Sequence, residues 1–456
     1  MKKKMLAVLL AGTMVMAALA GCGAKEETKT SESSKVEESK TETKTEESKV
    51  EESKEEVKDY TGQTLRIGWW GGDARHEQTM TIVEEFEKQY PGLTVEVEFA
   101  AFGDYFTRLN TQAAGGELPD VMQMDVGKIY TFADNDQLLD LTPYIEDGSI
   151  DMTNVSDSAA AMGEVCDGNY GVACGMNGLT LLYNPAILEE AGCTLSMEPT
   201  LSELVDVAKT VYEKTGARIH SLGSNTGEIF YRSLGRDRYA VGEDAFGFTE
   251  EDLLTWAQLN LQVVEDDTIS IPDNEVEADN ASKLAAGEIW CIAESSNQIV
   301  SYEAASGVTL EMVAQPHADD ATVEYPTYLK PAMLWSVAAD TEMAELAVAF
   351  IDYYTNSTSV YDVCGIDRGV PISSAIREYL LPGLSEADQK SFAYVDYLSE
   401  HSTPMNLYTP AKASEALVPI NELFEKITYK AVTADELPEL VHEAYEKASA
   451  IISAAE

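Results

Sequence analysis

TLRIGWWGGD, residues 64–73, is a mostly apolar strand-like run that ends in two glycines and an aspartate. A strand followed by such a glycine turn is a typical start of a strand–helix unit. Apolar residues then recur at helical spacing through Phe86, until Pro91-Gly92 ends the pattern, and residues 93–99 alternate as a second strand. The sequence therefore predicts a βαβ opening and an α/β protein.

The same alternation continues along the chain. A predicted helix over 104–114 is broken by Gly115-Gly116, and residues 119–125 form a short buried strand that ends on Asp125. The last third contains mostly helical patterns, so we expect an α/β fold with helices concentrated late. Further predicted strands are 171–183, 289–293 and 333–338, and further predicted helices are 201–215, 250–264, 343–354 and 437–454.

The N-terminal residues predict the cellular location. Three lysines precede an apolar run over residues 5–19 that is short for a membrane span, which is typical of a secretory signal. The run ends in LAGC at 19–22, which resembles the bacterial lipobox and implies lipidation of Cys22. The alternative is an ordinary signal with a chance cysteine. We expect an extracytoplasmic protein held at the cell membrane by acyl chains on Cys22.

Residues 23–59 are almost entirely Glu, Lys, Ser and Thr, and the unit SKVEESK occurs at both 34–40 and 48–54. Such a segment has too few apolar residues to form a core, so it predicts a disordered tether, with a transient helix as the alternative. Residues 60–456 exceed what one hydrophobic core usually serves. Two domains of roughly 200 residues each are therefore expected.

The net charge is −49, with 80 Asp and Glu against 31 Lys and Arg. Because a polyanion partner needs clustered basic residues, nucleic acid is excluded, and neutral or cationic ligands suit this chain better than anions. The five cysteines after Cys22 are odd in number and have no zinc-site spacing, and the histidines are scattered. No disulfide, metal or cofactor is predicted.

A series of short motifs resembles, in this order, those of one family. The chain is similar over nearly all of residues 60–456 to the family 1 extracellular solute-binding proteins of ABC importers, which are maltose-binding-protein-like. The motifs are WWGG at 69–72 with RH at 75–76, FEKQYPG at 86–92, residues 116–125, LYNP at 182–185 with AG at 191–192, AGE at 286–288, SNQ at 296–298 and RGVP at 368–371.

This resemblance implies a two-lobed, periplasmic-binding-protein-like fold (type II), in which crossing segments join the lobes and the ligand lies between them. By analogy, lobe 1 comprises residues 60–174 and 314–366, and lobe 2 comprises residues 175–313 and 367–456. The glycines of 171–178 and the Arg368-Gly369 pair then lie at hinges, where small residues absorb backbone rotation.

A sugar site needs planar aromatic side chains together with groups that make paired hydrogen bonds. Trp69 and Trp70 end the first strand and point to opposite sides by alternation, so we expect Trp70 in the cleft and Trp69 under a helix. A cation in the first turn of a helix gains nothing from the helix dipole, so Arg75 needs a partner elsewhere. The candidate ligand-binding residues are Trp69, Trp70, Gly72, Arg75, His76, Asp125, Asn177, Glu294, Asn297 and Arg368, the last four mainly from their family positions.

Structural roles compete with each of these assignments. The glycines serve a tight turn equally well, Arg75 has many acids available for a salt bridge, and Asp125 could cap the next segment. Trp256, Trp290 and Trp335 are expected in the core, because they lie within apolar strand or helix patterns.

The predicted function is capture of a sugar or short oligosaccharide by a monomeric binding protein, which delivers it to the permease subunits of an ABC importer without catalysis. Three alternatives stay open: a peptide or cationic cargo, a surface adhesin or sensor, and a secreted carbohydrate-active hydrolase. The hydrolase would need two carboxyl groups across the scissile bond, and Asp125 with Glu294 is the conceivable pair.

Overall fold

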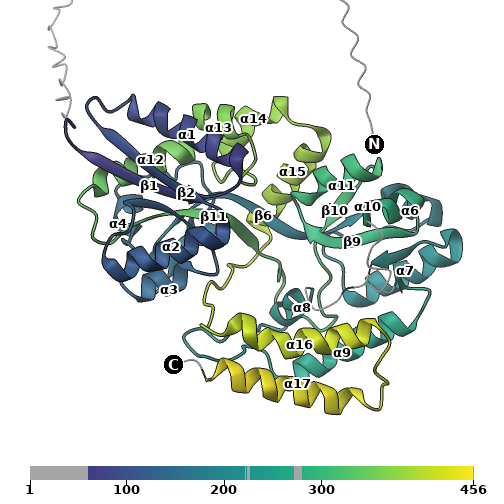
Figure 1. Ribbon diagram of the computed structural model, residues 1–456. Coiled ribbons are helices and arrows are strands. Elements are labelled where there is room, and N and C mark those ends of the chain that lie inside the picture. Colours follow the sequence, from purple (N-terminus) through teal and green to yellow (C-terminus); the bar gives the residue numbers. More distant parts are fainter. Residues whose placement is uncertain (1–59, 221, 223–225, 272–279, 455–456) are drawn as a thin grey trace, which may run out of the picture. The chain divides into compact units, whose positions relative to one another are not determined.

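The predicted βαβ opening is present in the computed structural model, which describes residues 60–220, 222, 226–271 and 280–454 (Figure 1). The strands β1 (Thr64–Trp70) and β2 (Thr94–Ala100) pair in parallel, and α1 (Asp73–Glu87) connects them. In Figure 1, α1 and α2 (Phe102–Gly115) lie on opposite sides of this pair. The predicted signal, Cys22 and the tether lie outside the described residues.

One mixed sheet runs through the molecule in the order β2-β1-β3-β11-β6-β9-β7-β8, and β10 also pairs with β6. The long strand β6 (Val172–Tyr183) joins its two halves, because it pairs with β11 up to Gly178 and with β9 from Leu179 onward. The other members are β3 (Val121–Met124), β7 (Arg218–His220), β8 (Ser270–Ile271), β9 (Ile289–Ser295), β10 (Glu311–Val313) and β11 (Leu329–Val337), and β4 (Glu164–Val165) and β5 (Gly168–Asn169) form a separate hairpin.

The predicted concentration of helices late in the chain is confirmed, since every element assigned after β11 in the described residues is a helix. Several helices start where the sequence supplies a cap: Thr200 accepts from the Glu203 amide, and Thr249 and Asp252 form a reciprocal capping box. The helices not yet given are α3 (Ile129–Asp134), α4 (Thr142–Glu146), α5 (Asp157–Ala160), α6 (Pro185–Ala191), α7 (Leu201–Thr215), α8 (Gly227–Ser233), α9 (Glu250–Glu265), α10 (Asn280–Ala286), α11 (Gln298–Ser306), α12 (Ala344–Asn356), α13 (Thr358–Cys364), α14 (Ser374–Leu380), α15 (Glu386–Glu400), α16 (Ala413–Thr428) and α17 (Leu437–Ile452).

Two hydrophobic cores form within the described residues. The first gathers buried residues of β1, β3, β6, β11 and α12, and the second gathers residues of α7, α9, α16 and α17. Strand β9 contributes to both, because Ile289 and Ile292 pack in the first core and Trp290 and Cys291 pack in the second. Apolar residues from Val370 to Leu407 pack in the first core, and Tyr408 packs in the second. The lobe boundaries that the resemblance implied stay a prediction.

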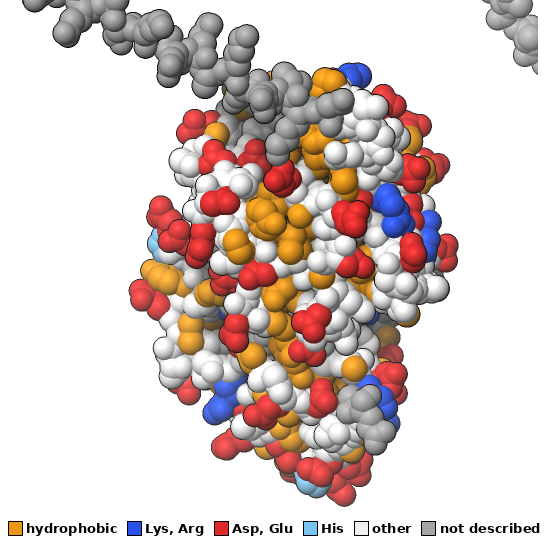
Figure 2. Space-filling model, turned by 90° about the vertical axis from the view of Figure 1, so that its left-hand side faces the viewer, with side chains coloured by type: hydrophobic (Ala, Val, Ile, Leu, Met, Phe, Trp, Pro, Cys, Tyr) orange, Lys and Arg blue, Asp and Glu red, His pale blue; other side chains and the backbone are white. Residues whose placement is uncertain are grey.

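Trp256, Trp290 and Trp335 are fully buried, which confirms the expectation that they belong to the core. The five cysteines of the described residues, Cys166, Cys174, Cys193, Cys291 and Cys364, are free thiols. Within the described ranges, none of the helices has both the length and the apolar run that a membrane crossing requires. The face seen in Figure 2 carries many acidic and few basic side chains, with hydrophobic side chains exposed between them.

Candidate functional site

Half of the predicted site residues lie in the turn between β1 and α1 or in the adjoining ends of that strand and helix. The Gly71 amide donates to the Ala100 carbonyl at 3.1 Å, which ties the turn to the end of β2. A Cβ on Gly71 would lie 2.6 Å from Cδ of Arg75, whereas one on Gly72 would meet no heavy atom within 4 Å. Gly71 therefore makes room for the arginine stem, and Gly72 presents an open stretch of backbone.

Both tryptophans of this turn are packed inside the protein. The Trp69 ring stacks on Phe99 at 5.3 Å and its indole N–H donates to Nδ1 of His76 at 3.1 Å. Trp70 is 7% exposed and packs on the opposite face of the sheet, against Tyr105 and residues beside it. The predicted alternation is thus present, but helices cover both faces, so neither indole ring is open to a ligand in this structure.

The surroundings of His76 favour its neutral form. Burial lowers its pKa, and although Asp73 raises it, the nearby arginines add to the lowering. Because Nδ1 accepts from Trp69, the ring proton belongs on Nε2. His76 therefore offers one N–H donor from a ring that stacks on Phe99 at 4.3 Å.

Arg75 has the partner that its position in the first helical turn required. Its Nε donates to Oδ2 of Asp367 at 2.9 Å, and its Nη2 donates to the carbonyl of the same residue at 3.3 Å. The salt bridge that was the alternative role for Arg75 is therefore present. It joins α1 to the loop before the RGVP motif. Direct ligand binding by Arg75 stays a prediction.

Arg368, the next residue along this loop, is buried. Its Nη2 donates to Oγ1 of Thr79 at 2.5 Å, and its Nη1 lies 3.5 Å from the sulfur of Met333. Among the described residues no carboxylate pairs with this guanidinium. Arg368 therefore holds the loop against α1 from inside the first core.

The middle of β6 meets this loop on one side and β9 on the other. A Cβ on Gly369 would lie 3.3 Å from Nδ2 of Asn177, and the next residue, Gly178, exchanges hydrogen bonds of 2.8 and 3.1 Å with Ser296. Asn297 follows Ser296 and is exposed at the start of α11. The Oδ1 of Asn177 is buried and accepts no hydrogen bond from the described residues.

Two predicted acids have hydrogen-bond partners of their own. Asp125 accepts from the Gly127 amide at 2.9 Å, so it caps the turn after β3 as one alternative proposed. Glu294 lies on β9 opposite Thr180 of β6 and accepts from the Tyr302 hydroxyl at 2.7 Å. The structure links Arg75, Arg368, Asn177 and Asn297 through one loop and one strand. Ligand binding by Asp125 and Glu294 stays a prediction.

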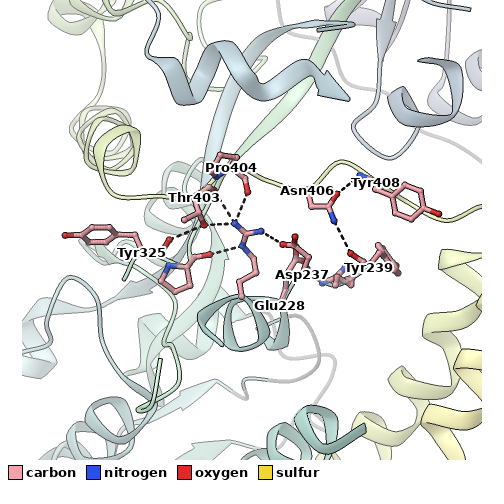
Figure 3. Close-up of polar contacts among 11 residues, drawn as sticks. Glu228, Asp237, Tyr239, Tyr325, Thr403, Pro404, Asn406 and Tyr408 are labelled. Atoms are coloured by element: carbon pink, nitrogen blue, oxygen red, sulfur yellow. Dashed lines mark hydrogen bonds and ion pairs between the residues drawn. The ribbon is translucent and has the colours of Figure 1, made fainter. Parts of the chain in front are cut away.

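Sequence reasoning missed a second polar network, around the segment that leads into the second core (Figure 3). The buried Arg232 of α8 donates to Oδ1 of Asp237 at 2.7 Å, to Oγ1 of Thr403 at 2.6 Å and to the carbonyl of Pro404 at 2.9 Å. Asn406 donates to the Tyr239 carbonyl at 3.0 Å. The prolines and polar residues of 402–410 were the available signal, but no local pattern points to an arginine 171 residues away.

Aromatic rings continue this network toward the first core. Tyr408 packs edge-on against Tyr130 of α3 at 4.6 Å, and its hydroxyl donates to Asp244 at 3.3 Å. A ring from α3 thus meets the segment that carries the chain into the second core. The pair lies where residues of both cores come into contact.

Glu198 is the most perturbed acid of the described residues, because burial raises its pKa to about 7. The Tyr397 hydroxyl donates to its Oε1 at 3.0 Å, and Oε2 is buried without a hydrogen-bond partner. Tyr397 in turn stacks on His401 at 4.3 Å. A protonated carboxyl is therefore favoured at this position in the folded protein.

The perturbed carboxyl makes stability depend on pH. Its pKa is 4.5 in an ordinary setting and about 7 in the folded protein, so the stability that the retained proton contributes is complete below pH 4.5 and is lost as the pH rises to 7. The side chain of Glu198→Gln stays neutral at every pH. The free energy of unfolding of this variant should therefore exceed that of the wild type by about 2 kcal/mol at pH 8 and equal it at pH 4.5. Urea unfolding at both pH values, with the exposed Glu213→Gln as control, measures this; a difference that does not change with pH would contradict it.

One group of side chains in the described part of the chain has metal-binding donors. Nδ1 of His442 lies 3.1 Å from Oε1 of Glu250, and Glu446 stands one helical turn further along α17. The imidazole and the carboxylates are exposed or half-exposed, and the contact with Glu250 is an ordinary surface ion pair when His442 is protonated. We assign it no metal.

Comparison with known proteins identifies the class. A family model described as bacterial extracellular solute-binding protein matches residues 81–389. An extracellular solute-binding protein family 1 from Alicyclobacillus acidocaldarius has a TM-score of 0.76 at 24% identity, covering 86% of this chain and 98% of that chain. A periplasmic oligogalacturonide binding protein from Yersinia enterocolitica has a TM-score of 0.71 at 21% identity, covering 86% and 99%. An ABC substrate-binding protein from Listeria monocytogenes, solved with cycloalternan, has a TM-score of 0.62 at 17% identity, covering 85% and 98%.

The α/β fold is therefore that of the two-lobed solute-binding proteins, and the predicted fold class is confirmed. This chain belongs to the bacterial extracellular solute-binding proteins. Its place is extracytoplasmic, and the resemblance seen in the sequence motifs is confirmed.

Proposed function

We propose that this chain is the substrate-binding component of an ABC importer, which captures a sugar or short oligosaccharide between its lobes and delivers it intact to the permease. The observation that carries the proposal is the match of the whole folded region to a solute-binding protein for oligogalacturonide and to one solved with cycloalternan. Family membership supports binding rather than bond breaking.

The proposed site combines side chains of α1, β6 and the start of α11. Arg75, His76, Asn177 and Asn297 offer N–H donors and amide groups to sugar hydroxyls, and the salt bridge to Asp367 fixes the Arg75 fork. Ligand contacts from both lobes would shift an open–closed equilibrium by their differential affinity for the closed form. No cofactor takes part in this cycle.

The proposed attachment is a lipid on Cys22, followed by the tether of residues 23–59. The sequence LAGC at 19–22 and the extracytoplasmic family support it. Multiple acyl chains on one cysteine hold a large domain at a membrane, because each buried methylene contributes about 0.8 kcal/mol. A monomer is sufficient for delivery to permease subunits in the same membrane.

A thermal-shift screen tests the proposed function. We expect at least one of maltotriose, xylotriose, cellotriose and digalacturonic acid to raise the melting temperature, because a ligand that binds only the folded state stabilises it. Chromatography of the same samples should return the sugar uncleaved. A tripeptide and spermidine are the comparison ligands. Stabilisation by these two alone would contradict the carbohydrate assignment, and shortened sugars would support the hydrolase.

A further inference from the structure

Three large apolar side chains are exposed on the edge strand β2 and at the start of α2. Val97, Phe99 and Phe102 are 38%, 36% and 46% exposed. Exposed apolar side chains that occur singly are ordinary on protein surfaces, and Val97 and Phe99 lie within β2. Phe102 is different, because it follows the carboxyl ends of the parallel strands β1 and β2, where α/β proteins bind their ligands.

Phe102 is the most exposed of the three and is held firmly. Its ring packs edge-on against Trp70 at 5.5 Å and against Phe106 at 5.0 Å. These contacts fix the ring in one orientation while nearly half of the side chain stays in solvent. A rigid, exposed aromatic ring is the surface on which the C–H face of a sugar ring packs.

The neighbouring backbone leaves room for such a ligand and supplies donors. Cβ atoms built on Gly72 and Gly103 would meet no heavy atom within 4 Å. Gly72 precedes α1 and Ala101 precedes α2, and no side chain caps either helix. Amide N–H groups of the first turns are therefore left to solvent or to hydroxyl oxygens.

The charges beside the ring restrict the chemistry of the ligand. Asp73 and Asp104 lie in the first turns of α1 and α2, and both are exposed. A sugar that carries a carboxylate would meet like charges there, whereas neutral hydroxyls donate to carboxylates. The site therefore suits a neutral sugar ring better than a uronic acid.

We infer that Phe102 provides the stacking surface of the carbohydrate site and that its occupant is a neutral sugar ring. The inference rests on the proposed function and deepens it, because it replaces the buried Trp70 by an exposed ring and narrows the ligand class. Trp70 then has a supporting role, since it holds Phe102 in place from below.

Titration calorimetry of the wild type and three variants tests the inference. The two ligands are digalacturonic acid and the neutral oligosaccharide that gives the largest thermal shift. Phe102→Leu keeps an apolar side chain without the π face, and Phe102→Tyr keeps the ring. Tyr429→Leu removes an aromatic ring of matched exposure just after α16. Because stacking on an aromatic ring is worth about a factor of ten, Phe102→Leu should weaken binding of the neutral sugar about tenfold. The other two variants should stay within about twofold of the wild type.

The outcomes separate this inference from the proposed function. Wild-type affinity in Phe102→Leu, with its melting temperature unchanged, would overturn the assignment of Phe102 while carbohydrate binding stands. Tighter binding of digalacturonic acid than of any neutral sugar would overturn the ligand class. If the wild type binds no carbohydrate at all, both the proposed function and this inference fail.

Discussion

Arg232→Ala should destabilise the protein by about 3 to 5 kcal/mol, because it removes a buried charged donor and leaves its partners unpaired. The guanidinium is 7% exposed and donates from Nε to the Pro326 carbonyl at 2.9 Å. Its other nitrogens serve Asp237, Thr403 and Pro404, as Figure 3 shows. Three segments that are far apart in the sequence would lose their common attachment. Urea unfolding followed by circular dichroism measures the loss.

Two further variants show whether the geometry of the fork matters. Arg232→Lys keeps the charge, but an ammonium group cannot reproduce the planar fork, so it should recover only part of the lost stability. Arg236→Ala is the control, since the Arg236 side chain is 43% exposed against 7% for Arg232. Its partner Asp252 keeps its hydrogen bonds from Thr249, so the loss should be at most about 1 kcal/mol. Equal stability of Arg232→Ala and Arg236→Ala would contradict the structural role of this network.

Local patterns predicted the elements well, because helical and strand periodicity depend on neighbours in the sequence. The predicted helix over 201–215 is α7 at the same bounds, and the strand over 64–70 is β1. The order of strands in the sheet was beyond such reasoning. β6 pairs with β11, more than 150 residues later in the chain, and only the resemblance to a family implied the crossing.

The candidate site was predicted less completely than the fold. Arg75 was expected to need a distant partner, but its identity as Asp367 depends on a contact across 292 residues. The strand alternation of Trp69 and Trp70 was correct, yet it does not reveal that helices cover both faces. Phe102 was available to the same reasoning, since it lies three residues after the predicted strand 93–99. The predicted helix began at residue 104, so Phe102 was assigned to a loop and given no role.

Gly175→Ala should destabilise the protein by about 3 kcal/mol, because the added methyl group has no space in β6. A Cβ at Gly175 would lie 2.2 Å from the Arg368 carbonyl oxygen and 3.1 Å from the Gly369 carbonyl carbon. These are backbone atoms and cannot rotate away as a side chain would. The loop is also held to β6 by paired hydrogen bonds of 2.8 and 3.0 Å between Met176 and Val370, which the displaced loop would lose.

Gly72→Ala is the matched control for this prediction. Its φ of −98° suits any residue, and its Cβ would meet no heavy atom within 4 Å, so its stability should stay within about 0.5 kcal/mol of the wild type. Both variants are compared by urea unfolding at one pH. Because Gly175 lies against the RGVP loop two residues before Asn177, its variant should also weaken sugar binding if this loop sets the position of Asn177. A stable Gly175→Ala variant with wild-type affinity would show that this loop moves freely from β6 and does not shape the site.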